Sequence, residues 1–264
     1  MPYAPTPYLL VETDGPVTIL TMNNPDMRNA FVDELHEAMQ EIWMHLSNDD
    51  SVRAVVLTGA GTAFSAGGNI PDFIRSYEDP DHRRKALRGA KRLMDAMTEF
   101  PKPVVTAVNG AAVGLGCNVA LGGDLVLMAE RAFMADTHVS IGLVAGDGGA
   151  VIWPALIGFA RAKEFLMTGD MITAPEAARM GLINHAVPAA ELDDKVMLLA
   201  NRLAKGALLA IRWTKRSVNL QLRDIVNRVL DPSVAYEAVS NRTSDHKEAV
   251  DAFLDKRRPV FRGR

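Results

Sequence analysis

Cysteine is almost absent from this sequence, because Cys117 is the only one among 264 residues. A single thiol cannot form an internal disulfide bond, so we expect a reducing compartment. Cys117 stands in an apolar stretch without a neighbouring charge. That setting is typical of a buried structural thiol rather than a nucleophile.

Charge of one sign is not in excess either. The 29 basic residues nearly balance the 32 acidic ones, and no basic stripe suggests a nucleic-acid surface. No apolar run approaches the roughly 20 residues that a membrane span needs. Residues 1–5 contain neither the basic region nor the apolar core of a signal peptide. We therefore expect a cytoplasmic protein that binds neither nucleic acid nor membrane.

Several motifs that would fix a catalytic class are missing. Gly114-Leu115-Gly116 begins like a dinucleotide fingerprint, but Val119 stands where the third glycine is needed. The sequence has no Walker A motif, no serine-hydrolase elbow and no paired zinc-protease histidines, so we expect no bound metal. The histidines outside the candidate site are expected at the surface, and they are His36, His45, His82, His185 and His246.

What the sequence does contain is an alternation of short apolar strands with helices. Strands are predicted over Tyr8–Thr13, Val17–Met22, Ala54–Thr58, Val104–Val108, Asp124–Ala129, Arg131–Ala135 and Asn184–Val187, with a hairpin turn at Asp14-Gly15. Helical spacing follows over Phe31–Leu46, His82–Glu99, Gly116–Leu121 and from Leu192 to Lys256, with an interruption near Asp231-Pro232. This order predicts an α/β core over residues 1–200 and a helical region over residues 201–264.

Two loops rich in small residues follow predicted strands, over residues 64–70 and 109–118. Glycine lets a ligand approach the backbone closely, and a helix that opens after a loop leaves its first N–H groups free. Two such loops could donate to one oxygen and form an oxyanion hole. Both loops could equally be tight strand-to-helix turns.

These loops and the segments after them resemble the crotonase (enoyl-CoA hydratase/isomerase) family. Phe64-Ser65-Ala66-Gly67-Gly68-Asn69-Ile70 resembles the family's small-Ala-Gly-x-Asp-Ile segment, and Asn109 to Asn118 resembles its Asn-Gly-x-Ala-x-Gly-Gly-Gly segment. Gly148-Gly149, Phe165–Gly169, Ala177–Ile183 and Phe253–Phe261 continue the match in order. The resemblance implies a crotonase fold, a spiral of ββα units with a C-terminal helical trimerisation region, and a homo-trimer or a hexamer.

The resemblance also implies an acyl-CoA substrate and the residues that would hold it. The N–H groups of Ala66 and Leu115 would form the oxyanion hole. The coenzyme A part of the substrate would contact Met27, Arg28, Gly68, Asn69, Ile70 and, from a neighbouring subunit, Phe253 and Lys256. Asn69 departs from the family's usual aspartate. No permanently bound cofactor is implied.

The family's hydratases use two glutamates, which here fall on Asn118 and His138. The amide of Asn118 cannot exchange a proton near pH 7, whereas a histidine with a pKa of about 6.5 can. Asp136 and Asp147 lie on the same strand and loop. Asp147 could orient His138 or carry a proton itself. The alternative is that Asp147 only caps the next helix and His138 is a core residue.

Three functions follow from these residues. The first is a lyase of the enoyl-CoA hydratase/isomerase family that stabilises an enolate, with His138 and Asp147 in place of the glutamate pair. The second is a C–C bond hydrolase of a β-diketone or β-ketoacyl substrate, because residues 137–154 also resemble that branch of the family. The third, which Asn118 favours, is a catalytically silent CoA-binding protein.

Overall fold

Two β-sheets form the centre of the molecule in the computed structural model, which describes residues 6–264. Residues 1–5, on which the expectation about a signal peptide rests, lie outside the described residues. The larger sheet has the order β1 (Leu9–Asp14), β2 (Val17–Met22), β3 (Ala54–Gly59), β5 (Val104–Val108), β7 (Leu125–Ala129) and β10 (His185–Val187). The smaller has the order β4 (Ala63–Ser65), β6 (Ala111–Val113), β8 (Phe133–Ala135) and β9 (Ile172–Thr173).

The larger sheet begins with the predicted hairpin. β1 and β2 pair antiparallel, and the turn between them lies at Gly15 and Pro16, one residue later than predicted; Gly15 takes a left-handed φ of 57° that suits glycine in a tight turn. From β2 onward the strands are parallel. The central strand β5 is buried along its whole length, which agrees with its unbroken apolar sequence.

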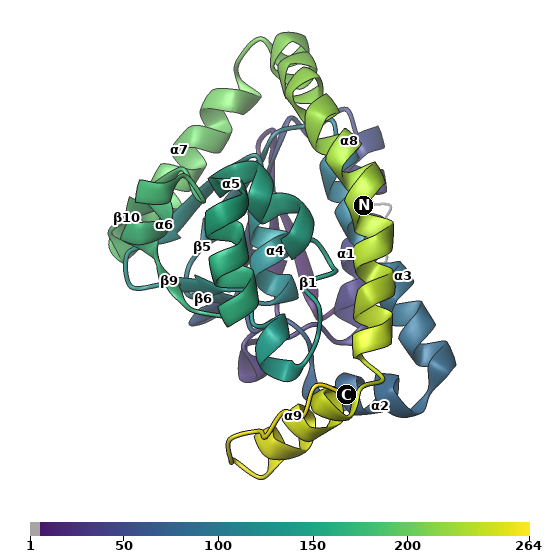
Figure 1. Cartoon of the computed structure of the whole chain (residues 1–264). Helices are drawn as coiled ribbons and strands as arrows, with labels where there is room; N and C mark the ends of the chain where they lie inside the picture. The colour runs from purple at the N-terminus through teal and green to yellow at the C-terminus, as the bar shows by residue number, and fades with distance from the viewer. Residues whose placement is uncertain (1–5) are drawn as a thin grey trace.

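Helices surround the sheets, and the C-terminal ones fold back over the body of the same chain (Figure 1). They are α1 (Asp33–Asn48), α2 (Ile70–Glu78), α3 (Pro80–Glu99), α4 (Leu115–Leu121), α5 (Gly149–Thr168), α6 (Ala174–Met180), α7 (Leu192–Ala204), α8 (Leu208–Ser240) and α9 (Ser244–Leu254). Short 3₁₀ turns are η1 (Pro25–Met27), η2 (His138–Ile141) and η3 (Ala189–Glu191). The long helix α8 packs on α3 and α5, and α9 packs on α2 and η2.

The two small-residue loops are more ordered than the sequence suggests. β4 overlaps the start of the first loop and β6 lies within the second, and these two three-residue strands pair parallel to one another. The sequence predicted neither of these two strands. The pairing brings the two loops side by side, which the sequence alone did not require.

The predicted interruption at Asp231-Pro232 is wrong, because α8 runs through Pro232 and ends at Ser240. Proline removes one backbone hydrogen bond from a helix. Packing nevertheless holds α8 together around this point, since Leu230 and Ser233 are both buried. After Ser233 the last two turns of α8 contain no buried residue, and Glu237 is half-buried there. Among the described residues, no helix is long and apolar enough to cross a membrane.

Lys102 is a buried anchor for the end of α1. Its side chain is 1% exposed, and its Nζ donates to the carbonyl oxygens of Leu46 at 2.5 Å and Asp49 at 2.6 Å. Burial lowers the pKa of Lys102 from its ordinary value. The ammonium group closes the C-terminal end of α1, where the helix dipole favours a positive charge.

We expect Lys102→Met to lower the free energy of unfolding by about 2–4 kcal/mol, because two buried carbonyls lose their donor. Lys163→Met, at an exposed lysine of α5, is the matched control and should change it by less than about 0.5 kcal/mol. Urea unfolding of the three proteins measures both effects. Equal stability of wild type and Lys102→Met would show that this anchor contributes nothing.

Candidate functional site

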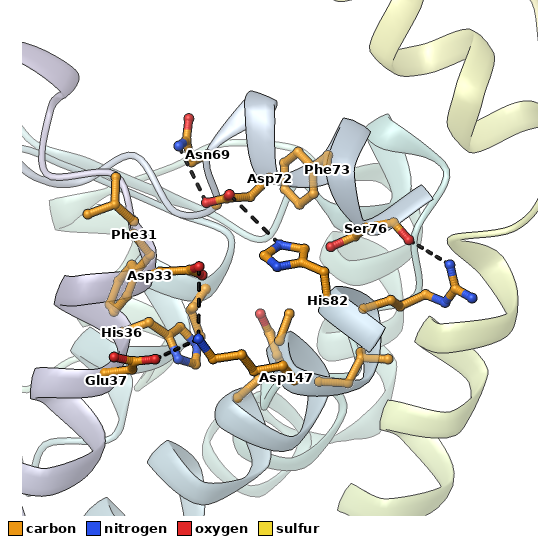
Figure 2. Close-up of a pocket in the computed structure, with 18 of the residues that line it drawn as sticks. Phe31, Asp33, His36, Glu37, Asn69, Asp72, Phe73, Ser76, His82 and Asp147 are labelled. Atoms are coloured by element: carbon orange, nitrogen blue, oxygen red, sulfur yellow. Dashed lines mark hydrogen bonds and ion pairs between the residues drawn. The ribbon is translucent and has the colours of Figure 1, made fainter. Parts of the chain in front are cut away.

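A cavity of about 680 Å³ lies between α1, α2, α3 and the inner end of α8. Its volume falls in the range of small-molecule sites. Figure 2 shows Asp33, His36, Asp72, His82 and Asp147 around this space. The lining residues used below are His36, Gly68, Asn69, Asp72, His82, Leu115, His138, Asp147 and Glu237.

Glycine allows the two small-residue loops to touch. Gly67 has a φ of 82°, and a Cβ added there would collide with the carbonyl oxygen of Val113. A Cβ on Gly116 would lie 2.6 Å from the Cβ of Ser65. Only residues without a side chain permit this approach. The contacts bring Gly68 of the first loop and Leu115 of the second to the same cavity.

Each loop has a free backbone N–H group on a residue that lines the cavity. Leu115 begins α4, and the first N–H groups of a helix have no partner within it. Within residues 6–264, the N–H groups of Gly68 and Leu115 make no hydrogen bond. The Ala66 N–H donates to the carbonyl oxygen of Arg28 at 2.8 Å and is not available to a ligand. This corrects the expectation for Ala66, and Gly68 offers a free donor in that loop instead.

The side chain of His138 lies between two carboxylates. Its Nδ1 is 2.5 Å from Asp136 Oδ1, and its Nε2 is 3.1 Å from Asp147 Oδ2. Burial opposes a charged ring, but the charges of Asp147 and Asp136 outweigh it and hold the pKa of His138 well above its usual value. Burial likewise opposes charge on Asp136, but the His138 charge holds the pKa of Asp136 below its ordinary value. At neutral pH the ring is therefore an imidazolium with both N–H groups engaged.

Asn118 joins the same two carboxylates from the other side. Its Nδ2 donates to Asp136 Oδ2 at 3.1 Å and to Asp147 Oδ1 at 2.8 Å, and its Oδ1 accepts from Trp153 Nε1 at 3.3 Å. A glutamate at this position would have no hydrogen to donate and would add a third negative charge. The amide at position 118 therefore fits the aspartates around it.

Glu237 on α8 is a site residue that the sequence analysis missed. One oxygen from Glu237, one from Asp147 and a ring nitrogen of His138 lie within 4.8 Å of one another. The Oε2 of Glu237 is enclosed and has no hydrogen-bond partner. Burial, followed by the charge of Asp147, raises the pKa of Glu237 to about 8. Such a group of side chains could ligate a divalent cation, but His138 Nε2 is already paired with Asp147.

A pattern in α8 could have identified Glu237. Val226, Leu230 and Ser233 are the buried positions of α8, and their spacing continues to Glu237. Residues three or four apart share one face of a helix. The predicted interruption at Pro232 concealed this continuity.

Two histidines expected at the surface are buried instead. His82 is 4% exposed and lines the cavity, with Nε2 at 3.8 Å from Asp72 Oδ1 (Figure 2). His246 is fully buried, and its Nδ1 bonds the carbonyl oxygen of Ile141 at 2.7 Å. Half-buried His36 also lines the cavity, and burial lowers its pKa. These rings lie on the inward faces of their helices.

The residues expected to contact coenzyme A are only partly brought together. Gly68 and Asn69 line the cavity. Among the other expected residues, Phe253 is 60% exposed on α9, and Lys256 is exposed just beyond it with a left-handed φ of 55°. The cavity lining of the single chain does not include Met27, Arg28, Ile70, Phe253 or Lys256.

Known proteins with similar sequences align with nearly the whole length of this chain. A 1,2-epoxyphenylacetyl-CoA isomerase of Escherichia coli (strain K12) is 33% identical over 97% of this chain and 99% of its own length. A short-chain-enoyl-CoA hydratase of Clostridium acetobutylicum is 31% identical over 95% of each chain. Both names describe proteins that act on CoA esters.

Solved structures of similar proteins share the fold. The crystal structure of an enoyl-CoA hydratase/isomerase from Mycobacterium paratuberculosis superposes with a TM-score of 0.90, at 38% identity, over 94% of this chain and 99% of its own. This likeness confirms the expected crotonase fold. The model of the enoyl-CoA hydratase/isomerase family matches residues 12–264, and the chain belongs to that family.

Proposed function

We propose that this protein removes a proton from the carbon beside the carbonyl of an acyl-CoA thioester and stabilises the resulting enolate. The observation that carries the proposal is one cavity that presents the free N–H groups of Gly68 and Leu115 together with the carboxylate of Asp147. The His138 ring lies beside the start of α4, because a Cβ on Gly114 would be 3.7 Å from its Cε1. The CoA esters in the names of the two relatives support the substrate class.

The chemistry divides between backbone and side chains. The thioester oxygen accepts hydrogen bonds from Gly68 and Leu115, which stabilise the negative charge as it develops. Asp147 takes the proton, and the electrons of the broken C–H bond enter the enolate. His138 is a positioning residue in this scheme, because both of its ring nitrogens are paired. Asp147 thus carries the proton itself, which is one of the two roles that the sequence left open for it.

Hydrolysis of a C–C bond is a second candidate. The cavity lining also includes His36, Asp72 and His82, and neither ring nitrogen of His82 has a hydrogen-bond partner. A β-diketone would present a second carbonyl to this polar wall, whereas a plain acyl chain would not. The third candidate, a silent CoA-binding protein, predicts no turnover.

One turnover screen separates the three candidates. Enoyl-CoA, β-ketoacyl-CoA and β-diketone substrates are offered to the same enzyme, and the products are identified. We expect turnover of an enoyl-CoA ester. Turnover of the diketone alone would establish the second candidate, and CoA binding without turnover of any substrate would establish the third.

We also propose that the chain forms a trimer or a hexamer, with the helical region over residues 201–264 at its interfaces. Helix α8 leaves large apolar side chains in contact with solvent in the single chain, including Val239, which is 69% exposed, and Trp213, which is 63% exposed. Patches of this kind mark protein interfaces. Analytical ultracentrifugation tests the assembly, and a monomer at micromolar concentration would refute it.

The first prediction concerns the oxyanion hole, whose backbone donors cannot be deleted by an ordinary substitution. Gly67→Ala places a Cβ against Val113 and should separate the loops, lowering kcat by about 10²–10³-fold, the usual effect of losing one such donor. Gly15→Ala is the control, because Gly15 has a similar φ of 57° but nothing within 4 Å. Full activity of a folded Gly67→Ala variant would contradict the assignment.

The second prediction concerns the base. Asp147→Asn should lose about 10²–10⁴-fold in kcat, the usual range for a proton-transfer group. Because charged His138 is the partner of Asp147, wild-type activity should fall as the pH rises through the elevated pKa of His138. A pH profile of kcat measures this. Activity that rises through that pKa would instead make the neutral imidazole the base.

The third prediction concerns Asn118. Asn118→Asp has the same shape but replaces the donor to Asp136 and Asp147 with another carboxylate, so we expect it to lose more activity and stability than Asn118→Ala. The two hydrogen bonds from its amide make Asn118 more important for activity than the sequence indicated. Kinetics and thermal melting of both variants measure the difference. Equal activity of wild type and Asn118→Asp would show that the amide donor is dispensable.

The fourth prediction concerns coenzyme A. If Lys256 of a neighbouring subunit binds the 3′-phosphate, calorimetry should show wild type binding CoA more tightly than 3′-dephospho-CoA, and Lys256→Ala should abolish that difference. Lys205→Ala, at an exposed lysine between α7 and α8, is the control. Wild-type discrimination retained in Lys256→Ala would remove Lys256 from the site.

A further inference from the structure

Three side chains of the types that bind metal ions lie together in the cavity lining, and His138 is not among them. They are Asp33, the first residue of α1, Asp72 on α2 and His82 on α3 (Figure 2). Each offers one ligand atom, and these three atoms lie within 4.8 Å of one another. The proposed enolate chemistry gives none of these residues a role.

The imidazole of His82 is enclosed by protein but makes no hydrogen bond. Its side chain is 2% exposed, and neither ring nitrogen has a hydrogen-bond partner among the described residues. Burying a polar group without a partner costs free energy, and native proteins seldom leave such a group unsatisfied. The ring therefore indicates a ligand that completes it.

The ring of His82 points at a carboxylate oxygen. Its Nε2 lies 3.8 Å from Asp72 Oδ1, which is too long for a hydrogen bond. Asp72 accepts from Asn69 Nδ2 through its other oxygen, Oδ2, at 3.4 Å. Two atoms that each lie about 2.1 Å from one tetrahedral Zn²⁺ are roughly 3.4 Å apart. The spacing of Nε2 and Oδ1 is therefore close to that of two ligands that share one ion.

The charged groups around the two carboxylates leave room for a cation. Burial, followed by the charge of Asp33, raises the pKa of Asp72. Arg75 Nη1 lies 3.5 Å and Lys85 Nζ 4.0 Å from Asp33 Oδ2. Both of these side chains are more than half exposed, and Lys85 Nζ is closer to Glu37, at 2.7 Å. Exposed pairs of this kind contribute little, so they do not commit Asp33 to one partner.

We propose that Asp33, Asp72 and His82 form a binding site for a divalent transition-metal ion, and that the ion is Zn²⁺. One imidazole nitrogen and two carboxylate oxygens match the ligands that Zn²⁺ takes in proteins, whereas Mg²⁺ and Ca²⁺ take oxygen ligands. Three protein ligands leave a fourth position for water or for an oxygen atom of a molecule in the cavity. The sequence led us to expect no bound metal, because these ligands come from three separate helices without a motif.

Calorimetry tests the site with the metal alone, so its outcome does not depend on the proposed function. Chelator-treated wild type titrated with Zn²⁺ should bind one ion per chain. His82→Leu should bind Zn²⁺ at least about 100-fold more weakly, because loss of a hydrogen-bond partner behind a ligand already costs about 10–100-fold. Asp72→Asn, which keeps the shape of the side chain but not its charge, should also bind Zn²⁺ more weakly.

The control for this titration is His185→Leu, at an exposed histidine of β10, which should bind Zn²⁺ as wild type does. Mg²⁺ is the second titrant, and wild type should bind it far more weakly than Zn²⁺ because one ligand is an imidazole. Wild type that takes up no Zn²⁺ would overturn the proposal. So would equal Zn²⁺ affinity in wild type and His82→Leu, or equal affinity of wild type for the two metals.

Crystals soaked with Zn²⁺ locate the ion. The anomalous signal at the zinc absorption edge should peak between Asp33, Asp72 and His82. A peak beside His138 instead, where the other group of metal-ligating side chains in the described cavity lies, would contradict the assignment. Peaks confined to histidines on the surface would contradict it equally.

Thermal melting separates a metal ligand from a histidine that serves only the fold. Zn²⁺ should raise the melting temperature of wild type, because it binds the folded chain, and should leave that of His82→Leu unchanged. Without metal, His82→Leu should melt at the same temperature as wild type or higher, since an apolar side chain replaces a buried polar one that has no partner. A lower melting temperature of the metal-free variant would assign His82 to the fold and overturn the proposal.

Discussion

The sharing of one imidazolium by two buried carboxylates organises the whole site. Asp136 and Asp147 could not both be buried as anions without a positive partner, and His138 supplies it at 2.5 Å and 3.1 Å. Removing one member of such a group leaves an uncompensated charge in a medium of low dielectric constant. The same excess of negative charge favours an uncharged amide at Asn118, and burial together with this excess raises the pKa of Glu237.

The backbone contributes as much to the site as the side chains do. The free N–H groups of Gly68 and Leu115 reach one cavity because Gly67 and Gly116 let two loops approach more closely than any side chain would allow. Short strands on either side, β4 and β6, fix the register of the loops. Donors held this way need no reorganisation when charge develops on a bound oxygen.

Helix α8 links the C-terminal region to the chemistry. Residues 201–264 were expected to form the oligomer interfaces, and the exposed apolar side chains of α8 support that proposal. The same helix packs on α3 and α5 of its own chain and brings Glu237 to the cavity. Because α8 continues through Pro232, its first part can expose Trp213 on the outer surface while its last part brings Glu237 to the cavity.

The sequence by itself determined the features that depend on neighbouring residues. Local periodicity and turn residues gave the β1–β2 hairpin, the buried strand β5 and the two small-residue loops, and the ordered motifs gave the family. They also singled out His138 and Asp147, which the structure joins. The sequence did not predict the strands β4 and β6 or the continuity of α8, because each is stabilised by its partners rather than by its own pattern.

Only the tertiary structure decided which polar groups are free and which are engaged. The Ala66 N–H is unavailable because a carbonyl from a distant loop, that of Arg28, accepts it. His138 is charged because Asp136 and Asp147 both face it, and Glu237 lacks a partner because α8 folds it against them. A pKa and a hydrogen bond depend on every group within a few ångströms, and those groups come from remote parts of the chain.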